Sequence, residues 1–408
     1  MLTVGDALRC VLEHAETLGS CELPLAEALG HVLAERIVSD IDSPPHDKSV
    51  VDGYAIVAES ITQPGAVLEV VEQVTAGEVP TRRLEAGLAT KIMTGAPLPS
   101  GADAVVMVEQ TSHVDSDSQR VRLMQFPVRS GQNIMRRATS LARGAAVLEP
   151  EKLLRAIEIG LLAEVGRQRV QVVRRPTVAI IATGNELVDW GATPGPGQIR
   201  NSNGPLLQAL ATQAGAEAKQ LPPAADDAEQ LAERIAEGLK HDVLILSGGV
   251  SEGVLDLVPQ SLARQGVEQI FHKVNLKPGK PLWFGRKTGG ASVGSTLIFG
   301  LPGNPVSTLV CFELFVRPAL SKLGGREANG LQRVTAKLAR DFQQRGERPT
   351  YWPASLSHVD SRPTVTPLPW QGSGDLRTLT EADCVAFFAG ENRTFAAGEE
   401  ISVLLLPS

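Results

Sequence analysis

The stretch from Val243 to Asp256, VLILSGGVSEGVLD, most constrains how this chain can fold. An apolar run of strand length ends in Ser247-Gly248-Gly249, and a helical pattern carrying an acid follows. This order is typical of an anion-binding corner, because paired glycines let backbone N–H groups approach a ligand closely. Parallel-sheet proteins also turn at Gly-Gly for steric reasons, so the corner alone leaves both interpretations open.

Alternating strands and helices surround this corner. Strands are predicted at 177–182, 242–246, 266–272 and 297–299, and helices at 205–214, 225–239, 254–265 and 305–320. This alternation predicts a parallel sheet with helices on both faces.

The flanking segments have other patterns. Residues 2–18, 25–37 and 149–170 show the apolar spacing of helices. Short β-like runs separated by Gly and Pro predict a mainly β segment at 54–148. Further β runs after Gly324-Gly325 predict a C-terminal β domain.

Composition limits the possible functions. The net charge of −7 and the lack of a basic block argue against nucleic acid as the main partner. No apolar run approaches the roughly 20 residues of a membrane helix, and no signal peptide is evident, so we expect a cytoplasmic protein without a membrane anchor. The sequence has four cysteines, and their spacing is neither that of metal ligands nor that of a disulfide framework. We therefore expect all four to be reduced thiols: Cys10, Cys21, Cys311 and Cys384.

Three strand ends of the α/β segment lead into polar turns that contain glycine. They are ATGNEL at 182–187, LSGGVSEGVLD at 246–256 and FGLPGNPVS at 299–307. Because the carboxyl ends of parallel strands share one crevice, we expect the three turns to meet. They supply hydroxyls, backbone amides and carboxylates, from Thr183, Ser247, Gly248, Gly249, Gly303, Glu186 and Asp256.

A basic loop follows the second turn. In NLKPGKPLWFG, Pro278-Gly279 holds Lys277 and Lys280 on one tight loop, which suits a dianion or a pyrophosphate. Glu186 and Asp256 would repel such a ligand unless a divalent cation lay between, and their oxygens favour Mg²⁺. Asp256 could equally stabilise the first turn of its helix. The residues indicate an enzyme or binding protein for an anionic, nucleotide-like ligand with a divalent metal.

Other types of site have little support in the sequence. No G-x-G-x-x-G follows a strand with an acid about 20 residues later, and no P-loop is present. No Ser, His, Asp ordering at strand ends appears, which argues against a hydrolase triad.

Seven motifs in matching order resemble the MoeA family, molybdopterin molybdenumtransferase, which is also seen as the E domain of gephyrin. They span nearly the whole chain: SVVDGYA (49–55), IMTGAPLP (92–99), ATGNEL (182–187), PGQIRNSN (196–203), SGGVS (247–251), KPGKP (277–281) and GLPGNPVS (300–307).

The resemblance implies a multi-domain fold of α/β and β parts. A central three-layer α/β domain of the MoCF-biosynthesis type with a mainly parallel sheet is expected at 1–18 plus 171–325. An elongated helical and β linker region is expected at 19–42 plus 140–170, a β-rich insert domain at 43–139, and a C-terminal β-barrel-like domain at 326–408.

The resemblance also implies a reaction. Molybdate is inserted at the dithiolene sulfurs of adenylylated molybdopterin, a small anionic pterin, and AMP is released with Mg²⁺ as cofactor. The family forms homodimers whose active site joins the α/β domain of one chain to the DGYA and TGAP segments of the other. The molybdopterin adenylyltransferase and molybdoenzymes are the implied further partners.

Site residues follow from the positions that match the motifs. Those with implied catalytic roles are Asp52, Thr94, Glu186, Asp256, Lys277 and Lys280, and Glu186 and Asp256 are the implied metal ligands. Those expected to bind the pterin substrate are Thr183, Gly184, Ser247, Gly248, Gly249, Ser251, Pro302, Gly303, Asn304, Pro305, Asp226 and Arg136.

Two departures from the family pattern motivate other functions. Glu252 replaces a usual Val beside the anion corner, and the run Arg136–Ser140, RRATS, lacks an expected acid. They favour as the alternative a molybdopterin-binding scaffold or carrier with weakened catalysis. A third hypothesis, an adenylyltransferase acting one step earlier, would require ATP-dependent adenylylation.

Overall fold

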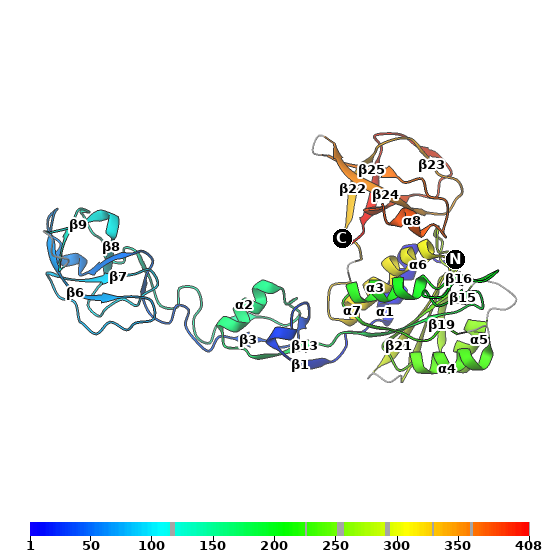
Figure 1. Cartoon of the computed structure of the whole chain (residues 1–408), viewed down its shortest axis with the longest axis horizontal. Coiled ribbons are helices and arrows are strands. Elements are labelled where there is room, and N and C mark those ends of the chain that lie inside the picture. The colour runs from blue at the N-terminus through cyan, green and yellow to red at the C-terminus, as the bar shows by residue number, and fades with distance from the viewer. Residues whose placement is uncertain are drawn as a thin grey trace. The chain divides into compact units, whose positions relative to one another are not determined.

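The computed structural model of the chain describes residues 1–114, 119–224, 227–250, 257–289, 294–328, 330–359 and 362–407. The chain divides into two compact units (Figure 1). The first comprises Met1–Ala34, Leu153–Arg155 and Arg169–Ser408, and the second comprises Glu35–Lys152 and Ala156–Gln168. The expected boundaries of four domains stay a prediction.

The first unit is built on a six-stranded sheet in the order β17-β14-β18-β21-β20-β19. The strands are β17 (Glu217–Gln220), β14 (Thr177–Ala182), β18 (Val243–Ser247), β21 (Ser295–Leu301), β20 (Trp283–Thr288) and β19 (Glu268–His272). The first four run parallel, and β20 pairs antiparallel with both β21 and β19. The mainly parallel sheet is confirmed, but β20 was not expected from the sequence.

Side-chain alternation along the strands separates two buried faces of this sheet. Val178 and Ile180 of β14 belong to one apolar cluster, and Ala179 and Ile181 belong to the other. The first cluster includes residues of α1 (Val4–His14), α3 (Asn203–Gln213) and the helical run α6 (Pro305–Cys311), η4 (Phe312–Val316) and α7 (Arg317–Leu323). The second includes residues of α4 (Ala228–Gly238) and α5 (Leu257–Arg264). The expected three-layer α/β domain is confirmed.

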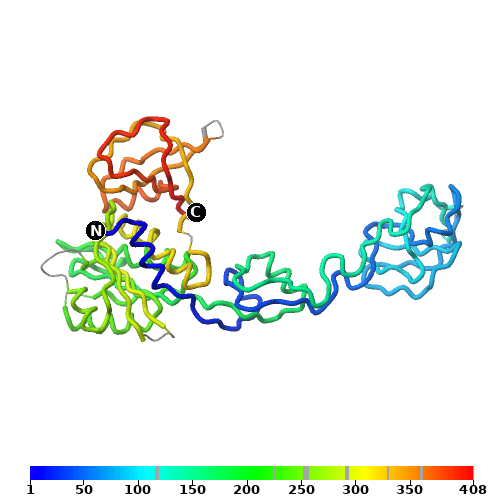
Figure 2. Tube along the Cα trace, turned by 180° about the vertical axis from the view of Figure 1, so that it is seen from behind, coloured from blue at the N-terminus to red at the C-terminus, as the bar shows by residue number. Residues whose placement is uncertain are grey.

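The N-terminal helix is part of this domain. Figure 2 shows the blue α1 beside the yellow helical run, and Lys322 Nζ of α7 donates to Leu12 O at 2.8 Å. The helix is shorter than the predicted 2–18 and begins where Thr3 Oγ1 accepts a hydrogen bond from Asp6 N. The predicted helix at 305–320 is present, with a π-helical turn at η4.

The helix predicted at 25–37 is wrong. Only a 3-10 turn, η1 (Leu25–Glu27), forms there, and β2 (Val32–Leu33) and β3 (Ile37–Val38) follow. Strand β2 pairs with β13 (Arg169–Val173), which also pairs with β1 (Ser20–Pro24). Pairing with a strand more than a hundred residues later overrides the local apolar spacing.

The prediction of helix over 149–170 is partly wrong. The helix α2 covers only Ala156–Glu164, because Glu151 has a positive φ of 68° and residues from Arg169 form β13.

The second unit carries the expected mainly β fold. Its six-stranded sheet has the order β8-β5-β7-β6-β10-β9. These strands are β5 (Gly53–Ile56), β6 (Val67–Val74), β7 (Leu88–Ile92), β8 (Ala104–Met107), β9 (Thr111–His113) and β10 (Arg120–Leu123). Two short pairs accompany it, β4 (Lys48–Ser49) with β11 (Ile134–Met135), and β3 with β12 (Ala146–Leu148). The 3-10 turns η2 (Ala58–Ser60) and η3 (Val108–Gln110) and the helix α2 also belong to this unit.

The C-terminal segment of the first unit forms a closed barrel in the order β22-β25-β24-β26-β28, as expected. Its strands are β22 (Arg333–Leu338), β24 (Thr350–Val359), β25 (Arg362–Pro367), β26 (Cys384–Phe388) and β28 (Glu400–Leu405). A short pair, β23 (Phe342–Gln343) with β27 (Thr394–Phe395), and the helix α8 (Leu376–Leu379) lie beside it. Among the described helices of the whole chain, none is long and apolar enough to cross a membrane.

Candidate functional site

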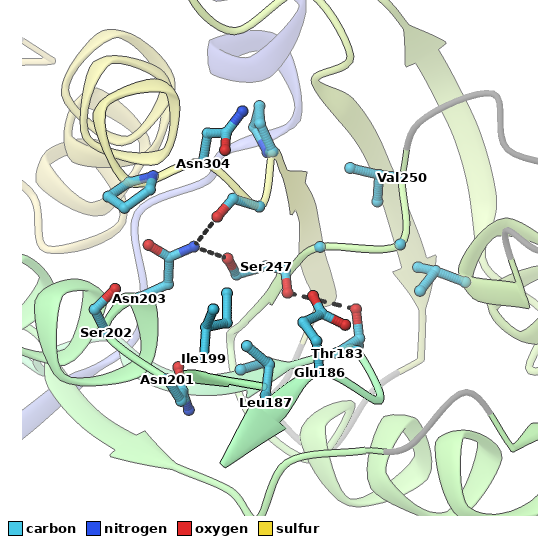
Figure 3. Close-up of a pocket in the computed structure, with 18 of the residues that line it drawn as sticks. Thr183, Glu186, Leu187, Ile199, Asn201, Ser202, Asn203, Ser247, Val250 and Asn304 are labelled. Atoms are coloured by element: carbon cyan, nitrogen blue, oxygen red, sulfur yellow. Dashed lines mark hydrogen bonds between the residues drawn. The ribbon is translucent and has the colours of Figure 1, made fainter. Parts of the chain in front are cut away.

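The three glycine-containing turns meet at the carboxyl ends of β14, β18 and β21, as the strand order predicts. Thr183 N donates to Ser247 O at 2.9 Å, which joins the first turn to the second. Asn203, at the start of α3, donates through Nδ2 to Ser247 Oγ at 2.8 Å and to Gly303 O at 2.7 Å (Figure 3). A buried hydrogen-bond network therefore holds the three turns in one fixed arrangement.

Steric crowding explains both glycines of the central corner. Gly248 has a φ of +95°, and a Cβ there would lie 2.6 Å from Thr183 O. At Gly249, with a φ of +63°, a Cβ would lie 2.9 Å from a methyl group of Val258. The N–H of Gly248 donates to Leu301 O at 3.1 Å, so this amide helps to shape the turn in this structure.

A cavity of about 690 Å³ opens above the turns. Ten of the residues predicted to bind substrate or metal line it: Thr183, Gly184, Glu186, Ser247, Gly248, Gly249, Pro302, Gly303, Asn304 and Pro305. Figure 3 shows Glu186 beside Thr183 on the same side of the cavity. The short pair β15 (Leu187–Val188) and β16 (Ile199–Arg200) contributes Leu187, Ile199 and Arg200 to its wall.

The two lysines of the basic loop line a second cavity, of about 400 Å³. It shares Pro281 with the first cavity, and both reach the 372–374 turn of the C-terminal segment. Its other polar or aromatic lining comes from α6 and the barrel region: Ser307, Arg348, Trp352, Trp370, Gln371 and Ser373.

Backbone pairing between the α/β sheet domain and the barrel builds this second cavity. Lys277 N donates to Pro349 O at 2.8 Å, and Tyr351 N donates to Lys277 O at 2.7 Å. Val306 N, in the first turn of α6, donates to Ser373 O at 3.0 Å. Within the described parts of the chain, Lys277, Lys280 and Arg348 have no ion-pair partner. Three unneutralised cations on one recess favour an anionic ligand.

The remaining predicted residues that the structure describes belong to the second unit. Asp52 Oδ1 accepts hydrogen bonds from Thr94 N and Thr94 Oγ1, both at 2.7 Å. These two bonds lower the pKa of the Asp52 carboxyl. Gly53, next in the DGYA motif, packs so tightly on β8 that a Cβ would overlap Val106 O. Arg136 Nη1 donates to Asp47 Oδ2 at 2.6 Å.

Four residues discussed from the sequence, Asp226, Ser251, Glu252 and Asp256, lie outside the described residues. Conversely, the cavities contain residues that sequence reasoning did not single out. Asn203 is the last residue of the PGQIRNSN motif, so that motif could have identified it as a site residue. Arg348, Trp352 and Trp370 come from a segment with no motif of its own.

Comparison with known proteins identifies the family. The model of the MoeA N-terminal region (domain I and II) matches residues 2–166, the probable molybdopterin binding domain matches 179–322, and the MoeA C-terminal region (domain IV) matches 335–406.

Similar proteins cover the chain from end to end. The molybdopterin molybdenumtransferases of Staphylococcus aureus (strain MSSA476) and Staphylococcus epidermidis (strain ATCC 35984) are 33% and 34% identical over 100% of this chain and 96% of their own length. Two solved structures of the molybdopterin biosynthesis MoeA protein from Pyrococcus horikoshii cover 100% of both chains at 31% and 29% identity, with TM-scores of 0.83 and 0.81. The chain belongs to the MoeA family of molybdopterin molybdenumtransferases.

Proposed function

We propose that this chain binds adenylylated molybdopterin and molybdate, inserts molybdenum at the dithiolene sulfurs and releases AMP. The observation that carries the proposal is the pair of adjoining cavities, one walled by strand-end turns and the other by three cations that form no ion pair with a described residue. A substrate with a polar organic part and an oxyanionic co-substrate needs two such compartments side by side.

The first cavity is the proposed site of the pterin substrate. Thr183 and Ser247 supply hydroxyls, and the turn at Pro302–Pro305 supplies backbone groups close to the first turn of α6. Asn203 holds the turns in position, so the donors are arranged before the ligand binds. Preorganised groups of this kind stabilise developing charge without reorganisation.

The second cavity is the proposed site of molybdate. Lys277 and Lys280 face the ligand from one loop, and Arg348 approaches from the barrel region with Nη1 near Leu276 O, at 3.4 Å. Ammonium and guanidinium groups attract a dianion and donate charge-assisted hydrogen bonds to its oxygens. Charge neutralisation and positioning are therefore the proposed contributions of these side chains to the reaction.

Glu186 is the described carboxylate that fits a magnesium site in the first cavity. One carboxylate suffices when phosphate oxygens of the substrate and waters complete the shell, as is usual for Mg²⁺. Asp256, outside the described residues, is the proposed second ligand. When bound, the ion would neutralise charge on the pyrophosphate, and Lys277 and Lys280 would hold the oxyanion.

We further propose a cytoplasmic homodimer in which the partner chain supplies Asp52, Thr94 and Arg136 to the site. The support is that the DGYA and TGAP motifs are joined by the bonds from Thr94 to Asp52. The molybdopterin adenylyltransferase, as supplier of the substrate, and molybdoenzymes, as recipients of the product, are the proposed further partners.

The direct test is AMP release by the purified protein supplied with adenylylated molybdopterin, molybdate and Mg²⁺. We expect molybdate-dependent release that Lys277→Met and Arg348→Met weaken mainly by raising the KM for molybdate, roughly tenfold or more for loss of one charge-assisted contact. Lys219→Met, at an exposed position of β17, is the matched control. A folded protein that releases no AMP would overturn the proposal.

Glu252 and the RRATS run favour one other candidate, a scaffold or carrier that binds molybdopterin with weakened catalysis. The same assay separates the two functions, because the carrier would bind the pterin tightly without AMP release. Restored release in Glu252→Val would identify this residue as the cause.

A further inference from the structure

An open groove of about 790 Å³, here called the α3 groove, follows the exposed face of α3 and shares no lining residue with the first or second cavity. Five of its residues recur along α3 at the i, i+3, i+4, i+7 and i+8 positions of one helical face. They are Pro205, Gln208, Ala209, Thr212 and Gln213. Trp190, from the segment between β15 and β16, and Gln220, the last residue of β17, complete the lining. The volume is in the range of sites for small organic ligands, roughly 300–1,000 Å³.

The α3 groove carries no formal charge. The eleven residues of α3 include no Asp, Glu, Lys or Arg. The helix packs into the sheet domain through Leu207, Leu210 and Ala211, and the groove occupies its other face. An exposed helix face normally carries charged side chains, and the equally long α4 has four, among them Glu233 and Arg234. The uncharged face of α3 therefore favours a neutral ligand.

Trp190 brings an exposed aromatic ring to this groove. The residue is 57% exposed, and none of the described aromatic pairs includes it, whereas Trp352 packs edge-on against Trp370 with the ring centroids 4.7 Å apart. The backbone beside Trp190 is held in place, because Gly191 N donates to Asp189 Oδ1 at 2.8 Å. An unpaired indole on such a loop offers a surface on which another flat ring can stack.

Two glutamines of the groove are oriented by partners outside it. Gln208 donates through Nε2 to Ala218 O, and Gln213 accepts through Oε1 from Arg317 Nη2, both at 3.3 Å. A carbonyl can only accept and a guanidinium can only donate, so neither amide can be flipped without loss of its bond. Glu313 neutralises Arg317 through a second bond, at 2.8 Å. The groove thus offers the Oε1 of Gln208 as an acceptor and the Nε2 of Gln213 as a donor, and no described residue bonds to either atom.

We propose that the α3 groove binds an uncharged, planar heteroaromatic ring with hydrogen-bonding atoms on its rim, of the purine or pterin kind. Trp190 stacks on the face of the ring, and Pro205 and Ala209 supply the apolar floor. The amides of Gln208 and Gln213 bond to a donor and an acceptor on the rim, which ring nitrogens and amino groups provide. No described residue that lines the first cavity is aromatic, so stacking distinguishes the two sites. Occupancy of the groove can be measured without AMP release, so this inference stands apart from the proposed function.

The test is an NMR titration of the full-length protein with adenosine or hydroxymethylpterin, followed through the indole N–H signals of the tryptophans. The chain has four tryptophans, and Trp190→Phe assigns the Trp190 signal by its loss. We expect at least one of the two rings to move this signal saturably, and the tighter binder identifies the kind of ring. Absence of a saturable shift with both would overturn the proposal.

Two further compounds separate the features of the ligand. Ribose phosphate has charge but no aromatic ring, and benzyl alcohol has an aromatic ring without hydrogen-bonding atoms in it. Each should bind at the Trp190 signal roughly tenfold more weakly than the heteroaromatic ring, or worse, because each lacks one of the two kinds of contact. Equal affinity for either compound would contradict the assignment of a neutral heteroaromatic ligand.

A matched pair of arginine variants assigns binding to the groove. Ala209→Arg places a long charged side chain in the groove, and Ala236→Arg makes the same change at an exposed position of α4. Arginine is a good helix former, so both helices should persist. By calorimetry, we expect the affinity for the ring to fall at least about tenfold in Ala209→Arg and to stay unchanged in Ala236→Arg.

Trp190→Ala, in an exposed loop, is the second variant and should weaken binding to a similar extent. Wild-type affinity in both Ala209→Arg and Trp190→Ala would contradict the proposal. A change in the sedimentation of Ala209→Arg would show that the groove joins two copies of the chain, and it would overturn the proposal as well.

Discussion

The side-chain amide of Asn203 donates to the hydroxyl of Ser247 at 2.8 Å and so links the start of α3 to the end of β18. The same nitrogen donates to Gly303 O, a group that can only accept, which fixes the orientation of the amide. Asn203 Oδ1 is buried and has no partner among the described protein atoms. One side chain thus sets the spacing between two of the turns that line the first cavity.

Replacement of this amide by a carboxylate should impair the site more than the fold. In Asn203→Asp the side chain keeps its shape but cannot donate to Ser247 or Gly303. The unpaired acceptors cost about 1–3 kcal/mol of stability, which leaves the chain folded. The turns lose their fixed spacing, and because small misplacements of site groups slow a reaction strongly, we expect roughly a tenfold or greater loss in kcat/KM for AMP release. Steady-state kinetics with a thermal unfolding control measure this effect.

Asn392→Asp is the matched control, because Asn392 uses its oxygen to accept from Gly346 N, and a carboxylate keeps that bond. Unchanged kinetics in Asn203→Asp would remove Asn203 from the list of residues that position the site.

The pair of Arg174 and Asp242 should contribute strongly to stability. The Asp242 carboxylate is 1% exposed and also accepts hydrogen bonds from Thr177 N and Oγ1, both at 2.8 Å. Removal of a buried charge partner costs roughly 3–5 kcal/mol, and we expect about 3 kcal/mol for Asp242→Asn because Arg174 is 30% exposed. Urea denaturation measures the loss. The exposed pair of Arg286 and Glu268 gives the comparison, since Glu268→Gln should cost less than about 1 kcal/mol.

The bonds from Thr94 make the ionisation of Asp52 depend on its neighbour. The backbone N–H and then the hydroxyl of Thr94 lower the pKa of Asp52 from the ordinary 3.8. A lowered pKa adds stability above the unfolded-state value, and this stability is lost as the pH falls through the folded-state value. Thr94→Val removes only the hydroxyl, so the pKa of Asp52 should rise part of the way towards 3.8.

Carboxyl NMR titration of Asp52 checks this prediction. Thr81→Val, which removes a hydroxyl bonded to Glu72 in the same unit, should leave the pKa of Asp52 unchanged. An unaltered Asp52 pKa in Thr94→Val would show that the backbone bond alone accounts for the shift.

The strand-end turns could be predicted from the sequence because each turn depends on residues that are neighbours in the chain. An apolar run followed by Ser247-Gly248 predicts a buried strand and a tight turn, and parallel topology then brings the turns together. The partners of each turn are not local. The contact from Asn203 to Ser247 depends on where α3 crosses the strand ends, which the order of elements alone does not determine.

The errors in the predicted elements have the same origin. Residues 25–37 have helical spacing, yet Val32 and Leu33 pair with Val173 and Val172 in β13. Likewise, the second cavity joins Lys277 to Arg348 and Trp352, which the barrel brings to the basic loop. Contacts between residues so distant in the chain are absent from local periodicity, so the sequence could predict the lysines but not their partners.

Two glycines of the first cavity should differ sharply in their tolerance of a methyl group. Gly248→Ala requires a φ of +95° in an L-residue and places Cβ 2.6 Å from Thr183 O, a backbone atom that cannot rotate away. Gly303→Ala places Cβ 3.7 Å from Gly248 Cα, an ordinary contact without a positive φ. We expect Gly248→Ala to lower the free energy of unfolding by at least about 1 kcal/mol and to abolish AMP release. Gly303→Ala should keep its stability, so any loss of activity in it reports on ligand contact alone. Denaturation and pterin-binding measurements on both variants test this difference in stability and activity. Equal stability of the two variants would contradict the prediction, because it would mean that the turn at Gly248 can accept a Cβ.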